Sequence, residues 1–102
     1  MAVKISGGKK GNTDMFRLWG KLWKQNKMLQ NMTVTVEDES LNRTRKIFQA
    51  LEEICYAYDL SKPLWLDKNI EEFKRHDKTR FSQDNFIDTI DFDYLEIQVL
   101  EE

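Results

Sequence analysis

The chain has 102 residues and a formal net charge of −2; 40% of its residues are hydrophobic and 33% are charged. This length and composition exclude a disordered chain and predict one domain with a single core. No stretch approaches the roughly 18 apolar residues of a membrane-spanning helix, and the one cysteine, Cys55, excludes an internal disulfide. A cytoplasmic protein that does not use a membrane is therefore expected.

Charge is unevenly distributed along the chain. Residues 1–30 hold seven basic residues and one acidic residue, whereas residues 71–102 hold four basic and ten acidic residues. Such asymmetry is typical of a nucleic-acid-binding arm or an acidic tail; alternatively, the two ends meet inside the fold. Residues 1–14 contain three glycines and three lysines without a hydrophobic period. They predict a flexible leader, followed by one domain over residues 15–102.

The first folded segment, residues 15–36, is compatible with a helix or with a β-hairpin. The hairpin is favoured because "MTVTV" is β-branched and alternating, and because Gly20 costs a helix about 1 kcal/mol relative to alanine. Strands over residues 16–24 and 28–36 are then joined by the loop Gln25-Asn26-Lys27. This register places Phe16 opposite Val36, Leu18 opposite Val34 and Gly20 opposite Met32 on one face, with Trp19, Trp23 and Leu29 on the other.

A long amphipathic helix gives the clearest pattern in the chain. Its apolar residues recur at three- and four-residue steps: Thr44, Ile47, Phe48, Leu51, Ile54, Cys55 and Tyr58. Asp38 and Ser40 are both candidate N-caps for a helix of about five turns. We expect Phe48, Leu51, Cys55 and Tyr58 to pack on Leu18, Val34, Leu95 and Ile97.

Shorter elements follow the long helix. Pro63 favours an extended "SKPLWL", and Asp67 can cap a second helix, "KNIEEFKRH", that buries Ile70 and Phe73. The segment 77–91 suggests one helical turn after Ser82, anchored by Phe81, Phe86, Ile87 and Ile90. The alternation of residues 93–101 predicts a closing strand, with Leu95, Ile97 and Val99 on one face and Tyr94, Glu96, Gln98 and Leu100 on the other.

The predicted fold class is α+β. It comprises an N-terminal β-hairpin, a long amphipathic helix, a shorter helix and a C-terminal β-strand that joins a small sheet of three strands or slightly more. The segments "FRLWGK", "KIFQALEEICYAYDLSKPLWL", "FKRHDKTRF" and "IDFDYLEIQV" resemble small hypothetical proteins of anaerobic Gram-positive bacteria. This resemblance implies a bacterial cytosolic origin and brings no activity with it.

Three groups of residues could carry chemistry, and each has a simpler structural interpretation. Cys55 and His76 are the one possible thiol–imidazole pair, but Cys55 lies in the apolar stripe, where cysteine behaves as a small hydrophobe. Glu72 and His76 share a helix face, but a zinc site needs about two further ligands.

Clustered carboxylates such as Asp88, Asp91 and Asp93 suit Mg²⁺ or Ca²⁺, yet they also suit turns before a strand. No phosphate-binding glycine motif and no nucleophile motif occurs. The sequence therefore predicts neither an enzyme nor a bound cofactor or metal.

The surface that merits attention is the second face of the hairpin. It combines residues of both predicted strands with residues of the closing strand: Arg17, Trp19, Lys21, Trp23, Leu29, Tyr94, Glu96 and Leu100. Trp, Tyr and Arg are enriched at protein-interaction hot spots, and aromatic residues beside cations suit single-stranded nucleic acid. A third alternative is that the short helix and "PLWL" cover this face.

The sequence thus predicts a non-enzymatic protein-interaction or regulatory module that uses the outer face of its sheet. A weak single-stranded nucleic-acid binder is the second hypothesis, which the acidic C-terminal third disfavours. The partner on that face would be another protein or a second copy of the chain. In such a homodimer, Arg17 or Lys21 of one copy would lie beside Glu96 of the other.

Overall fold

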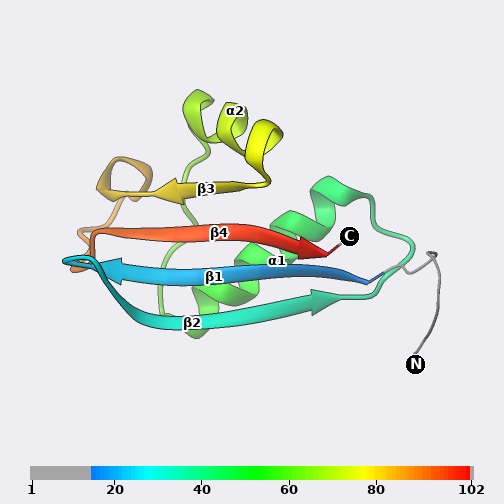
Figure 1. The fold of residues 1–102 in the computed structure, drawn as a ribbon, viewed down its shortest axis with the longest axis horizontal. Helices are drawn as coiled ribbons and strands as arrows, with labels where there is room; N and C mark the ends of the chain where they lie inside the picture. The colour runs from blue at the N-terminus through cyan, green and yellow to red at the C-terminus, as the bar shows by residue number, and fades with distance from the viewer. Residues whose placement is uncertain (1–14, 102) are drawn as a thin grey trace.

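The computed structural model describes residues 15–101, so the predicted leader lies outside the described residues. In chain order the elements are β1 (Phe16–Lys24), β2 (Lys27–Val36), α1 (Arg43–Ala57), α2 (Asp67–His76), β3 (Lys78–Phe81), a 3₁₀ turn (Gln83–Asn85) and β4 (Tyr94–Glu101). The strands form one antiparallel sheet in the order β2-β1-β4-β3. Figure 1 shows α1 crossing behind the sheet, with no described element in front of it. The fold is α+β, with α1 on one face of the sheet and α2 beside its β3 edge.

The β1–β2 hairpin has the predicted register over most of its length. Phe16 pairs with Val36, Leu18 with Val34 and Gly20 with Met32. The predicted three-residue loop is wrong. The turn has two residues, Gln25 and Asn26, whose φ angles of 52° and 64° match the left-handed positions of a tight hairpin turn.

An extra residue in β2 reconciles the shorter turn with the predicted register. Leu22 pairs with Gln30, but Trp23 pairs with Met28, so Leu29 is left over as a β-bulge. The predicted register, if continued to the turn, would set Leu29 opposite Trp23, but Met28 occupies that position.

The closing strand β4 lies in the middle of the sheet, between β1 and β3. Leu95 and Ile97 are fully buried in the core, as their alternation predicts. The sequence did not predict β3, whose Thr79 and Phe81 lie opposite Ile97 and Leu95. The predicted turn after Ser82 forms as the 3₁₀ turn, but Ile87, expected as an anchor, is exposed.

Helix α1 packs its apolar stripe against β1 and β2. The buried residues of its stripe are Ile47, Ala50, Leu51, Ile54 and Cys55. The expectation that Phe48 is buried is wrong, because 52% of this α1 residue is exposed. Tyr58 is half-buried, and its hydroxyl donates to the Gly20 carbonyl at 3.2 Å.

The two helix caps also differ from the predicted ones. Asn42 caps α1, since its side-chain oxygen accepts from the Arg45 N–H at 2.9 Å, while the Asp38 carboxylate accepts from Ser40 instead. In α2 the N-cap is Leu66, and Asp67 is the first helical residue.

At 15 residues, α1 has about four turns rather than the expected five. Helix α2 buries Phe73 as predicted, but Ile70 is exposed and Asn69 is buried in its place.

A buried pair of asparagines holds α2, β3 and the 3₁₀ turn together. Asn85 Nδ2 donates to Asn69 Oδ1 at 2.7 Å, and Asn69 Nδ2 donates to Thr79 Oγ1 at 2.9 Å. The Thr79 hydroxyl in turn donates to Glu72 at 2.6 Å. Because these buried polar groups satisfy one another's hydrogen-bonding capacity, we assign them a structural role.

Candidate functional site

The outer face of the sheet is the face that points away from α1. Strand residues alternate between the two faces, so the neighbours of the buried Leu18, Leu22, Leu95 and Ile97 point outward. The outer face carries Arg17, Trp19, Lys21 and Trp23 from β1, Asn31, Thr33 and Thr35 from β2, Tyr94, Glu96 and Gln98 from β4, and Lys78 and Arg80 from β3.

A row of polar residues crosses the middle of this face, one from each strand. Asn31, Lys21, Glu96 and Arg80 lie directly opposite one another in register. The Glu96 carboxylate lies 3.2 Å from Lys21 Nζ and 3.3 Å from Arg80 Nε. Only 7% of Lys21 and 4% of Glu96 are exposed, so this ion pair is buried although its strands face solvent.

Aromatic side chains bury the ion pair from both sides. Trp23 Nε1 donates to Glu96 at 3.2 Å, and the Lys21 ammonium lies 3.9 Å from the centroid of the Trp19 ring. Arg80 lies 4.6 Å from the centroid of Tyr94, whose ring is 6.3 Å from that of Trp23. We call these six residues the outer-face cluster: Trp19, Lys21, Trp23, Arg80, Tyr94 and Glu96.

The electrostatics of the cluster favour an ionised Glu96. Burial alone would raise the pKa of this carboxyl. The hydrogen bond and charge of Lys21, followed by those of Arg80, outweigh burial and hold the pKa of Glu96 below its usual value. The cluster therefore contains a stable carboxylate between two cations rather than a group that exchanges protons near neutral pH.

The structure brings together five of the eight predicted surface residues: Trp19, Lys21, Trp23, Tyr94 and Glu96. Arg17 instead pairs with Glu101 at 3.3 Å, on the exposed end of β1. Leu29 lies in the β2 bulge, and Leu100 is skipped where the β1–β4 register shifts. Both leucines are exposed at the margin of the face rather than within the cluster.

Sequence reasoning missed Arg80 and Asn31. Arg80 was missed because β3 has only four residues, too few for its alternation to stand out. Asn31 follows from the predicted hairpin register, which places it opposite Lys21. Its side-chain oxygen accepts from Trp19 Nε1 at 3.2 Å.

The alternative in which "PLWL" and the short helix cover the outer face is wrong. The Trp65 ring packs edge-on against Phe81 at 5.1 Å and against Phe73 at 5.5 Å. Because Phe81 lies opposite the buried Leu95, this contact is on the α1 side of the sheet. The tryptophans of the outer face are half-buried by their own cluster, and no described element covers them (Figure 1).

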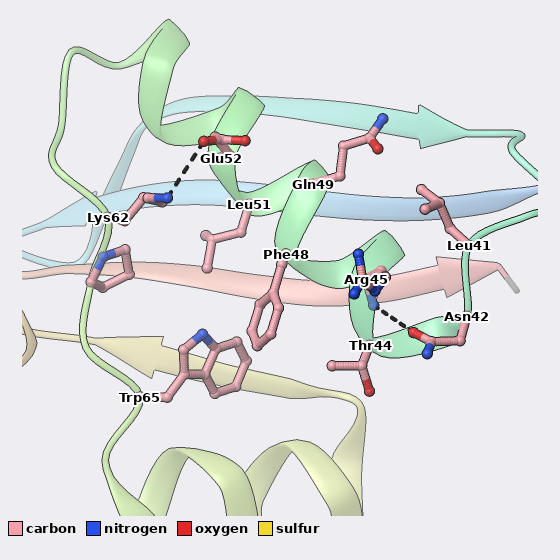
Figure 2. A pocket seen from close by; sticks show the side chains of 11 residues that line it. Leu41, Asn42, Thr44, Arg45, Phe48, Gln49, Leu51, Glu52, Lys62 and Trp65 are labelled. Carbon is pink, nitrogen blue, oxygen red and sulfur yellow. Dashed lines mark hydrogen bonds and ion pairs between the residues drawn. The ribbon is translucent and has the colours of Figure 1, made fainter.

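A groove of about 700 Å³ lies on the other side of the molecule, between α1 and residues 62–65. Figure 2 shows Phe48 and Trp65 side by side in it, with the Lys62–Glu52 ion pair at one end. Among its lining residues only Arg45, Glu52 and Lys62 carry charge. The groove therefore has a mixed lining, in which Phe48, Leu51 and Trp65 provide apolar surface and the charged residues lie beside polar ones.

Cys55 and Asp93, two residues that the sequence offered as candidates for chemistry, have contacts that stabilise the fold. Cys55 is buried, and this burial raises the pKa of its thiol to about 11, the opposite of what a nucleophile needs. Asp93 accepts from the Gln25 N–H at 2.8 Å and so supports the hairpin turn.

Within residues 15–101, no three His, Cys, Asp or Glu side chains are placed to hold a metal ion. No helix in that range is long and apolar enough to cross a membrane.

Comparison with protein-family models, curated proteins and solved structures finds no match for this chain.

Proposed function

We propose that this protein is a non-enzymatic interaction module that binds another protein on the outer face of its sheet. The observation that carries the proposal is the outer-face cluster, which gathers two tryptophans, a tyrosine and an arginine on a surface that no described element covers. These are the residue types that dominate binding energy at protein interfaces.

The contacts within the cluster support rigidity. Both indole N–H groups have partners, and the charges of Lys21 and Arg80 are held by Glu96. A surface whose side chains are already ordered loses little conformational entropy on binding, which favours affinity.

The same contacts favour a protein over single-stranded nucleic acid. Lys21 is buried against Glu96, so it would have to leave that carboxylate to reach a phosphate. One face of the Trp19 ring already holds the Lys21 ammonium, and one face of the Tyr94 ring holds Arg80. Base stacking needs open ring faces beside available cations.

A matched pair of tyrosine variants tests the proposal. Tyr94 belongs to the cluster, whereas Tyr56 lies on α1 and is 87% exposed. Immobilised wild-type protein, Tyr94→Ser, Trp19→Ser and Tyr56→Ser would be exposed to lysate of the source organism. Each partner identified would be purified, and its affinity for the four proteins measured. We expect a partner that binds the wild type and Tyr56→Ser but binds Tyr94→Ser and Trp19→Ser at least tenfold more weakly.

The result that contradicts the proposal is equal binding by all four proteins. A labelled single-stranded oligonucleotide provides the competing measurement. Binding of the oligonucleotide that falls steeply with salt and disappears in Trp19→Ser would favour the nucleic-acid function instead.

A further inference from the structure

The two edges of the sheet differ in their protection against pairing with another strand. At one edge, β3 has only four residues, of which Lys78 and Arg80 are charged. Helix α2 also lies against this edge, and Asn69 Nδ2 donates to the Arg80 backbone carbonyl at 2.9 Å. A short, charged and covered strand is a common way to prevent edge-to-edge association.

The β2 edge has none of these protections from residue 28 onward. The strand has ten residues, and residues 28–36 contain neither a charged residue nor a proline, although 33% of the chain is charged. Among the described residues β2 pairs only with β1, and its other side lies at the lower edge of the sheet in Figure 1. Such an edge presents a row of backbone donors and acceptors to another strand.

The residue pairs that a two-fold pairing of β2 would create favour a second copy of this chain as the occupant. Residues 30–36, between the bulge and the end of the strand, pair with β1 without a register shift and are centred on Thr33. If two copies pair antiparallel about Thr33, Thr33 lies opposite Thr33, Asn31 opposite Thr35, and Met32 opposite Val34. No like charges meet, and the partly buried Met32 gains an apolar neighbour.

We propose that β2 pairs antiparallel with β2 of a second copy about a two-fold axis near Thr33, so that two four-stranded sheets join into one. This inference does not depend on the proposed function, because it uses the edge of the sheet and not the outer-face cluster. In such a dimer, the two outer-face clusters would lie on one continuous sheet surface.

Charge variants of Thr33 test the two-fold pairing. Thr33 is exposed on the outer face, so its replacement leaves the core unchanged. We expect sedimentation velocity to show a dimer for the wild type at high micromolar concentration, and monomers for Thr33→Lys and Thr33→Glu at the same concentration. An equimolar mixture of the two variants restores the dimer, because opposite charges then meet at the axis. Thr89→Lys, the same change in an exposed loop, remains a dimer.

Hydrogen exchange on the wild type makes the test independent of the variants. Those backbone amides of residues 30–36 that point away from β1 should exchange at least tenfold more slowly at high than at low protein concentration, while the amides of β3 do not change. A wild type that sediments as a monomer at millimolar concentration overturns the proposal. A dimer that survives both Thr33 variants, or that is lost in Tyr94→Ser but not in Thr33→Lys, overturns it as well.

Discussion

Replacing Glu96 by glutamine should destabilise the protein more than any other single charge removal on the outer face. The substitution keeps the shape of the side chain but leaves Lys21 and Arg80 without their shared carboxylate. Breaking one partner of a buried ion pair typically costs about 3–5 kcal/mol. Arg80 is more than half exposed and can turn to water, and Lys21 keeps Gln98 at 3.3 Å and the Trp19 ring at 3.9 Å. We therefore expect the lower end, about 3 kcal/mol.

Urea unfolding followed by tryptophan fluorescence measures this free energy. The matched control is Glu101→Gln, because the Glu101–Arg17 pair lies on the same sheet at 3.3 Å but is about half exposed. Exposed pairs contribute about 0–1 kcal/mol. If Glu96→Gln lowers the free energy of unfolding no more than Glu101→Gln does, the Lys21–Glu96 pair is solvated. The outer-face cluster would then contain no buried ion pair.

The difference in stability between the wild type and Glu96→Gln should also depend on pH. Because the pKa of Glu96 is lowered in the folded state, its ionisation stabilises the protein fully at pH values above the pKa that this carboxyl has in the unfolded chain. This stabilisation is lost as the pH falls through the lower folded pKa. The difference in unfolding free energy between the wild type and Glu96→Gln should therefore be constant near neutral pH and shrink in acid. A difference that grows in acid would contradict the assignment.

Three further predictions concern the core. A methyl group at Gly20 would lie 2.8 Å from two atoms of Ile54, so Gly20→Ala should cost about 1–3 kcal/mol and be partly relieved by Ile54→Val; strictly additive changes in thermal unfolding would contradict this contact. Leu51→Ala should cost about 2–5 kcal/mol, whereas Phe48→Ala, at a half-exposed residue, should cost about half of the usual 3–5 kcal/mol for phenylalanine. Cys55 should react with iodoacetamide far more slowly in the native protein at pH 8 than in urea, since burial raises its pKa to about 11. Equal labelling rates would show that the thiol is accessible.

The elements in which a regular hydrophobic pattern continues over many residues were predictable from the sequence. The alternation of β-branched residues in β2 and of Leu95, Ile97 and Val99 in β4 identifies strands and their buried faces, because a strand side chain repeats every two residues. The predicted hairpin register then placed Trp19 and Trp23 on one face, and the alternation of the closing strand placed Tyr94 and Glu96 on one face of that strand. Most of the candidate site was thus visible in the sequence.

The details that depend on one strand meeting another were not predictable. The bulge at Leu29 and the register shift beside Leu100 each change the pairing by one residue, and each is decided by two strands together. Arg80 joins the cluster only because β3 pairs with β4, although its four residues carry almost no periodic signal of their own.

Tertiary structure also decided which side of each helix is covered. The three- and four-residue spacing placed Phe48 in the apolar stripe of α1. In the structure Phe48 instead packs edge-on against Trp65 and is half exposed. The sequence by itself determined the periods, and so the elements and their apolar faces, because these depend on neighbours along one segment. Only the assembled sheet decided that Lys21 and Arg80 both contact the buried Glu96 carboxylate. These residues lie on three strands that are far apart in the chain, and no local pattern encodes how such strands pair.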